Sequence, residues 1–153
     1  MDILTDDIIH FFHKQGFIII STMDGNRCPH SACKGMVHMS PDGIVYLLDL
    51  YRGETCQNLK ANPHISLTAV DEHKFVGYCL KGAAKVVPEE RIEPHIKKAW
   101  DERITSRLTK RVLKEIRDEV GHPNYPEVLL PKPEYMIIVQ VEEVVNLAPH
   151  SIR

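Results

Sequence analysis

The chain has 153 residues, which suits one domain with a hydrophobic core, and its hydrophobic and charged fractions of 43% and 26% are ordinary for a soluble globular protein. A formal net charge of −2 argues against general electrostatic attraction to nucleic acid or to an anionic membrane. The sequence lacks the apolar run of roughly 18 residues that a membrane-spanning helix needs, and its acidic start is unlike a secretion signal. Because four cysteines are too few for a disulfide framework at this length, we expect a protein of the reducing cytoplasm.

The first half of the chain alternates strand patterns with turn residues. A helix is expected first, because Thr5-Asp6-Asp7 is typical of a helix start and Gly16 of a helix end. Runs rich in β-branched residues follow, and Asp24-Gly25 between two of them is a strong hairpin signal. The run at 44–50 is apolar on both faces, which favours a central strand. The expected strands are residues 17–23, 29–39, 44–50, 64–70, 75–87 and 135–147.

Two more helices are expected between these strands. A short helix at 53–61 is ended by Asn62-Pro63. A long helix is expected over 89–120, because apolar residues recur at steps of four from Ile92 to Leu108. A proline-rich connector at 121–134 then leads to the last strand.

These elements predict the architecture. Five or six mostly antiparallel strands joined by short turns, with the helices set apart, indicate a mainly β (α+β) fold, a small closed barrel with flanking helices. We expect a single domain over residues 1–153, with a helical insertion at about 89–134 before the last strand.

The segment CPHSACKG at 28–35 raises the question of a metal site or a redox pair. Alternate residues of a strand share a face, so Cys28, His30 and His38 are expected on one face and, unless a β-bulge intervenes, Cys33 on the other. The spacing lacks the close ligand pairs of structural zinc sites, and the two cysteines lack the C-x-x-C arrangement of redox thiols. We therefore expect no metal, and buried or half-buried structural cysteines.

A longer pattern carries more information. After the Asp24-Gly25-Asn26 turn come P-x-S-A-x-K-G at 29–35, R-G-E-T-x-x-N-L-x-x-N-P at 52–63 and G-Y-x-L-K-G-x-A at 77–84. In this order and spacing the pattern, over about half the chain, resembles the pyridoxamine 5′-phosphate oxidase-like family of flavin-binding split barrels. The resemblance implies a six-stranded antiparallel split β-barrel of Greek-key type, and a homodimer that binds FMN in clefts at the subunit interface.

The resemblance also implies which residues meet the cofactor. The strand carrying Ser31, Ala32, Cys33 and Lys34 would run beside the isoalloxazine ring, and Leu48, Asp49 and Leu50 would line the same cleft. Arg52 and Thr55 would hold the phosphate. The chemistry of that segment agrees, because an arginine, a glycine and a threonine stand at the start of a short helix, where free N–H groups favour an anion. Relatives often carry lysine immediately before the threonine, where this chain has Glu54.

Several of these residues have simpler interpretations. Thr55 can instead cap its helix, and Lys34 can be a solvated strand lysine. Asn58 and Leu59 are expected to seat the short helix, and Gly82 to permit close strand packing or a bend. Trp100 is expected in the core or at an interface rather than stacked on a flavin.

The leading function is an FMN-dependent oxidoreductase acting on an unidentified small molecule, for which the sequence nominates no catalytic acid or base. One alternative is a non-enzymatic split-barrel module that binds haem, a deazaflavin or another ligand. Another is a protein-interaction domain that uses the basic stretch at 97–117. Acidic residues interleave with that stretch, which favours a solvated helix with ion pairs four residues apart.

Overall fold

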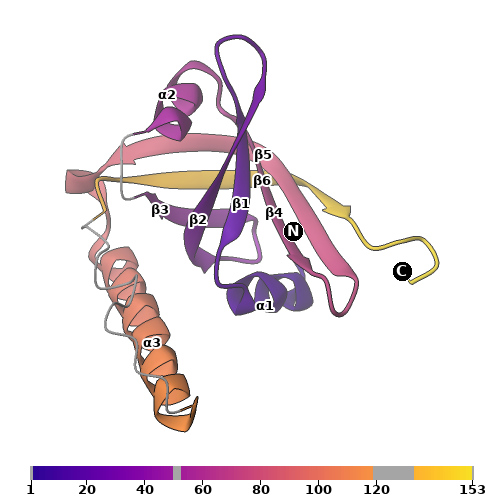
Figure 1. The fold of residues 1–153 in the computed structure, drawn as a ribbon. Coiled ribbons are helices and arrows are strands. Elements are labelled where there is room, and N and C mark those ends of the chain that lie inside the picture. Colours follow the sequence, from indigo (N-terminus) through magenta and orange to yellow (C-terminus); the bar gives the residue numbers. More distant parts are fainter. Residues whose placement is uncertain (1, 50–52, 119–132, 153) are drawn as a thin grey trace.

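The computed structural model describes residues 2–49, 53–118 and 133–152 (Figure 1). Its helices are α1 (Asp6–Lys14), α2 (Glu54–Ala61) and α3 (Pro94–Asp118), with a short 3₁₀ helix, η1, at Glu89–Arg91. Its strands are β1 (Ile18–Met23), β2 (Pro29–Met39), β3 (Ile44–Asp49), β4 (His64–Asp71), β5 (Val76–Pro88) and β6 (Tyr135–Asn146). The predicted helices and strands are thereby confirmed to within five residues at their ends. Most of the predicted connector, 121–132, lies outside the described residues.

The six strands form a closed antiparallel barrel in the order β1-β2-β3-β6-β5-β4. The prediction of a closed barrel with flanking helices is confirmed. β6 comes last in the chain and inserts between β3 and β5, so that β3 has β2 and β6 as neighbours. Figure 1 shows α1 and α2 near opposite ends of the barrel, while α3 extends away from its side.

The hairpin between β1 and β2 is confirmed, although its turn differs from the simplest Asp-Gly form. The Asp24 carboxylate accepts hydrogen bonds from the backbone N–H groups of Asn26 (2.8 Å) and Cys28 (2.9 Å). The left-handed backbone conformation of this loop is at Arg27, with φ of 62°. The aspartate side chain therefore organises a loop that is longer than a two-residue turn.

Two apolar clusters lie on the two faces of the barrel wall. The inner cluster fills the barrel, and Phe12 of α1 and Leu59 of α2 complete it from outside the sheet. The outer cluster lies between α3 and the strands, with Leu48 and Met136 of the sheet packed near Ile96 of the helix. These alternating faces follow from the period-2 geometry of strands.

The backbones of β5 and β6 approach each other closely at Gly82, as predicted. A Cβ atom built there would lie 2.0 Å from the carbonyl oxygen of Gln140, and the β5–β6 register shifts between Lys81 and Gly82.

Within the described ranges, none of the helices is both long and apolar enough to span a bilayer.

Candidate functional site

The expected cofactor strand, β2, presents its side chains to two opposite faces. Lys34 and Ala32 pair with Ile18 and Ile20 of β1, which belong to the barrel interior. Cys33 pairs with the exposed Ile19, on the outer face. Because cross-strand partners share a face, Ala32 and Lys34 point into the barrel and Cys33 points out of it.

Ser31 and Leu48 extend the outer face. The Ser31 hydroxyl lies 2.8 Å from the hydroxyl of Ser21 on β1, in an exposed position. Leu48 of β3 pairs with Gly35 of β2 and is 2% exposed within the outer apolar cluster beneath α3. The predicted cofactor residues therefore divide into an outer set, Ser31, Cys33 and Leu48, and an inner set, Ala32, Lys34 and Asp49.

The inner set contains a buried polar network across three adjacent strands. Lys34 Nζ donates to Asp49 Oδ1 at 2.6 Å, and the Tyr135 hydroxyl donates to Asp49 Oδ2. Asp49 and Tyr135 are 2% and 1% exposed. Burial, followed by the bond to Asp49, raises the pKa of Tyr135 far above its ordinary value, with a smaller contribution from Cys56. Lys34 is thus engaged with a carboxylate inside the barrel and is not a solvated strand lysine.

The outer face beneath α3 contains a cavity of about 250 Å³ next to Leu48. Trp100 of α3 lines this cavity and packs over Gly35, where a built Cβ atom would lie 3.1 Å from the indole ring. A glycine at that position of the P-x-S-A-x-K-G motif therefore gives the indole room to approach β2. Trp100 was expected in the core or at an interface, and it is partly buried against this outer apolar cluster.

The start of α2 lies above the β1–β2 hairpin. Its N-cap residue is Gly53, so Thr55 is the second residue of the helix and the interpretation of Thr55 as the cap is wrong. Gly53 supplies no side-chain cap, and a Cβ atom at Gly53 would meet nothing within 4 Å. Gly53 therefore gives the first N–H groups of α2 no side-chain acceptor, and helix N–H groups without a side-chain cap favour an anion.

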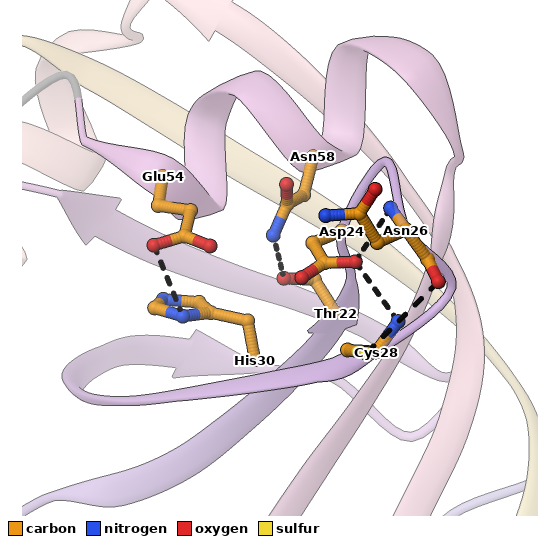
Figure 2. Close-up of polar contacts among 7 residues, drawn as sticks. All are labelled: Thr22, Asp24, Asn26, Cys28, His30, Glu54 and Asn58. Atoms are coloured by element: carbon orange, nitrogen blue, oxygen red, sulfur yellow. Dashed lines mark hydrogen bonds and ion pairs between the residues drawn. The ribbon is translucent and has the colours of Figure 1, made fainter.

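Figure 2 shows how α2 is held on the hairpin. Glu54 Oε2 lies 3.4 Å from His30 Nδ1 of β2, so the acidic side chain is directed toward the strand. Asn58 Nδ2 donates to Thr22 Oγ1 of β1 at 3.1 Å, in a buried position. Asn58 and Leu59 are both buried, which confirms that they seat the helix.

Two expectations for the segment at 28–35 are corrected. Cys28 and Cys33 are exposed, whereas buried or half-buried cysteines were expected; Cys56 is the buried one. A register shift between Met36 and His38 moves His38 to the outer face, so His30 and His38 lie on opposite faces. Among the residues that the structure describes, no three His, Cys, Asp or Glu side chains gather as metal ligands would.

Two predicted residues fall outside the described chain, and one important residue was missed. Leu50 and Arg52 lie outside the described residues. Tyr135 was expected only as the start of the last strand. Its partnership with Asp49 arises because the β3–β6 register places the two residues opposite each other, and a single sequence gives no signal for that register.

Comparison with known proteins places this geometry in a family. The family model described as pyridoxamine 5′-phosphate oxidase matches residues 4–128. A search of curated proteins found no match. Similar solved structures include HupZ of Group A Streptococcus, with a TM-score of 0.67, 19% identity and 95% of each chain covered.

Two other structures resemble the chain over most of its length. A putative pyridoxamine 5′-phosphate oxidase of Lactobacillus delbrueckii has a TM-score of 0.61 and 19% identity, with 93% of each chain covered. A pyridoxamine 5′-phosphate oxidase-related, FMN binding protein of Nostoc punctiforme has a TM-score of 0.55 and 10% identity, covering 92% of this chain and 79% of its own. At these identities the likeness concerns the fold, while the family model covers most of this sequence. The chain therefore belongs to the pyridoxamine 5′-phosphate oxidase-like family.

Proposed function

We propose that this protein is an FMN-binding flavoprotein that acts as an oxidoreductase on a small molecule. Membership of the pyridoxamine 5′-phosphate oxidase-like family is the observation that carries the proposal. The FMN binding protein of Nostoc punctiforme, which shares the fold, supports it. Two features of this chain's own residues also suit the cofactor, one for its phosphate and one for its ring.

The phosphate group of FMN fits the start of α2. Gly53 gives the first N–H groups of the helix no side-chain cap, and a Cβ atom built at Gly53 would meet nothing within 4 Å. Thr55 is only 3% exposed, so in this proposal its hydroxyl is not the main contact of the phosphate. The contact between Glu54 and His30 draws the one acidic side chain of the first turn toward β2, which lessens its repulsion of phosphate.

The isoalloxazine ring of FMN fits the outer face of β2, next to β3. Ser31 and Cys33 are exposed on β2, while Leu48 of β3 is buried beneath α3 and lines the cavity there. Bound FMN would supply the redox chemistry, because a flavin accepts and returns electrons that side chains cannot carry. Lys34 and Asp49 would support the strand from inside the barrel rather than touch the ring with their side chains.

We also propose a homodimer with the flavin at the interface between the two copies. Phe17, Ile19 and Met23 are 57%, 39% and 37% exposed. Ile19 and Met23 lie on the outer face of β1, and Ile19 is opposite the exposed Cys33. An apolar surface of this kind is suited to contact with a second copy. Light scattering should give twice the monomer mass for the purified protein, and Ile19→Asp should shift the protein toward monomer. A monomeric wild-type protein would contradict this part of the proposal.

A Gly53→Asp variant tests the phosphate site directly. Aspartate is a good N-cap residue, and the extended backbone of Gly53 (φ −96°, ψ −157°) accepts a side chain. The variant should therefore fold at least as well as the wild type. Its carboxylate would occupy the N–H groups that phosphate needs, so FMN affinity should fall about tenfold or more, equivalent to about 1.4 kcal/mol.

Riboflavin, which lacks the phosphate, provides the matched comparison. Its affinity should be almost the same for the wild type and for Gly53→Asp, as measured by quenching of flavin fluorescence. Gly53→Ser, a neutral cap, should fall between the two proteins for FMN. Equal loss of FMN and riboflavin would contradict the assignment of the phosphate to α2, and failure of the wild type to bind either flavin would contradict the proposed function.

A further inference from the structure

We propose that His30 is a positioning residue of the phosphate site, and that its charge controls, through Glu54, how tightly the start of α2 holds the phosphate of FMN. The inference rests on the proposed function, because the phosphate site is the one assigned there to α2. The affinity of this site for FMN would then respond to pH between about 5 and 8, the range in which histidine changes charge.

Two contacts, side by side, join α2 to the β1–β2 hairpin (Figure 2). Thr22 and His30 are directly opposite each other on β1 and β2. Glu54 and Asn58 are four residues apart and therefore lie on the same face of α2. Asn58 Nδ2 donates to Thr22 Oγ1 at 3.1 Å. His30 Nδ1 lies 3.4 Å from Glu54 Oε2, so this pair holds the first turn of the helix while the other contact holds the next turn.

The two contacts differ in burial and in charge. Thr22 and Asn58 are 4% and 7% exposed, and neither side chain is titratable. The side chains of His30 and Glu54 are 28% and 54% exposed, so the imidazole exchanges protons with solvent. A proton therefore changes the contact at the first turn, while the buried contact keeps α2 on the hairpin in either charge state of His30.

Glu54 is the carboxylate that answers the charge of His30. Within the part of the chain that the structure describes, no other carboxylate lies within ion-pair distance of His30. Lys34, on the same face of β2, is paired with Asp49, and β1 carries no titratable side chain between 18 and 23. The Asp24 carboxylate accepts two backbone N–H groups within the turn. The other titratable residues of that turn are Arg27 and Cys28.

The charge of His30 decides how strongly Glu54 opposes a phosphate. Glu54 is the first residue of α2 and the acidic residue of its first turn. A carboxylate in that turn is attracted by the same N–H groups that a phosphate uses, and it repels the phosphate. A charged His30 neutralises Glu54 and draws it toward β2. Beside a neutral His30 the carboxylate keeps its full charge and competes with the phosphate.

The test compares the FMN affinity of the wild type with that of His30→Gln at pH 8 and at pH 6, measured by quenching of flavin fluorescence. The phosphate itself gains a proton near pH 6, but the ratio of the two affinities at one pH removes this effect. The ratio of wild type to His30→Gln should lie within twofold of one at pH 8 and reach at least threefold at pH 6. For riboflavin it should stay near one at both pH values. The same FMN ratio at both pH values would overturn the inference.

Further variants locate the effect. In a Glu54→Gln background, adding His30→Gln should change FMN affinity by less than twofold at either pH. A threefold effect that persists without Glu54 would mean that His30 acts on the phosphate directly, and it would overturn the role assigned to Glu54. His73→Gln is the matched control, because His73 lies 3.8 Å from Glu72 in the turn at the far end of β4 from α2. An equal effect of His73→Gln would also overturn the inference.

The two proposals can fail separately. Uptake of FMN with a ratio that does not change with pH would overturn the role of His30 and leave the proposed function standing. A wild-type protein that takes up no FMN at either pH would contradict the proposed function, and the role of His30 with it.

Discussion

Lys34 Nζ lies 2.6 Å from Asp49 Oδ1, and this ion pair faces the interior of the barrel, whereas the neighbouring Leu48 faces α3 outside it. The pair is the direct consequence of register, since Gly35 opposite Leu48 places Lys34 opposite Asp49. The two faces of the same strands thus serve different purposes. The inner face holds a charged network that fixes the strands, and the outer face presents the surface proposed for the flavin.

The first prediction concerns the energetic importance of this ion pair. Lys34→Met should lower the free energy of unfolding by about 3 kcal/mol, because it leaves the buried Asp49 carboxylate without its cation. Lys81→Met is a matched control, since Lys81 and Glu143 form a cross-strand pair at 3.2 Å with half-exposed side chains; its cost should be about 0–1 kcal/mol. Urea unfolding measures both values, and similar costs for the two variants would refute the prediction.

A second prediction concerns acid stability. Arg103 of α3 donates to the carbonyl oxygen of Gln15 at the end of α1 (2.8 Å), close to His13. Burial, followed by the charge of Arg103, lowers the pKa of His13 below its usual 6.5. The folded state therefore binds fewer protons at His13 than the unfolded state, so this contribution to stability is complete above about pH 6.5 and is lost as pH falls through the lower folded-state pKa.

The variant His13→Gln should consequently show a smaller loss of unfolding free energy than the wild type between pH 7 and pH 5. His95→Gln serves as control, because His95 lies on α3 beside Glu93 (3.2 Å) rather than beside Arg103. If the His13 variant loses stability with the same pH slope as the wild type and the control, the packing of His13 beside Arg103 does not govern acid stability.

The close approach of β5 and β6 provides a third prediction. Gly82→Ala should destabilise the protein by more than about 2 kcal/mol, because a Cβ atom 2.0 Å from the Gln140 carbonyl forces the backbone to move. Gly16→Ala, where a Cβ atom meets nothing within 4 Å, should change the stability by less than about 1 kcal/mol. Thermal unfolding of the two variants compares them, and a tolerated Gly82→Ala would show that the strands separate more easily than the geometry implies.

The fourth prediction concerns the acidic residue at the phosphate segment. Glu54→Gln should raise FMN affinity by about threefold to tenfold, because it removes a negative charge from the first turn of α2. Riboflavin affinity should stay nearly constant, since the carboxylate opposes only the phosphate. A decrease in FMN affinity would indicate that Glu54, through His30, positions the helix more than it repels the ligand.

The fold was predictable because its signals are local. Each signal lies within a few residues of sequence: the alternation of apolar residues, the Asp24-Gly25 turn and the Asn62-Pro63 helix end. The strands and helices of the structure lie where these signals predict them. The role of Asn58 in seating α2 was also expected, and Asn58 Nδ2 donates to Thr22 Oγ1.

The site was less predictable because it depends on pairing between distant strands. Alternation along β2 separates Cys33 from Lys34, but only the pairing with Ile18 shows that Lys34 is the inner residue. The register shift between Met36 and His38 reverses which side chains of β2 face the barrel interior, and the alternation in the sequence does not predict this reversal. The link from Asp49 to Tyr135 spans 86 positions and follows from strand order alone.

The visible absorbance spectrum of the purified protein, with identification of the small molecule released on denaturation, tests the central claim most directly. The account predicts the absorbance bands of an oxidised flavin and release of FMN at about one molecule per chain, or stoichiometric uptake of added FMN by a protein purified without it. A colourless protein that takes up neither FMN nor riboflavin would contradict the flavin function proposed for this chain.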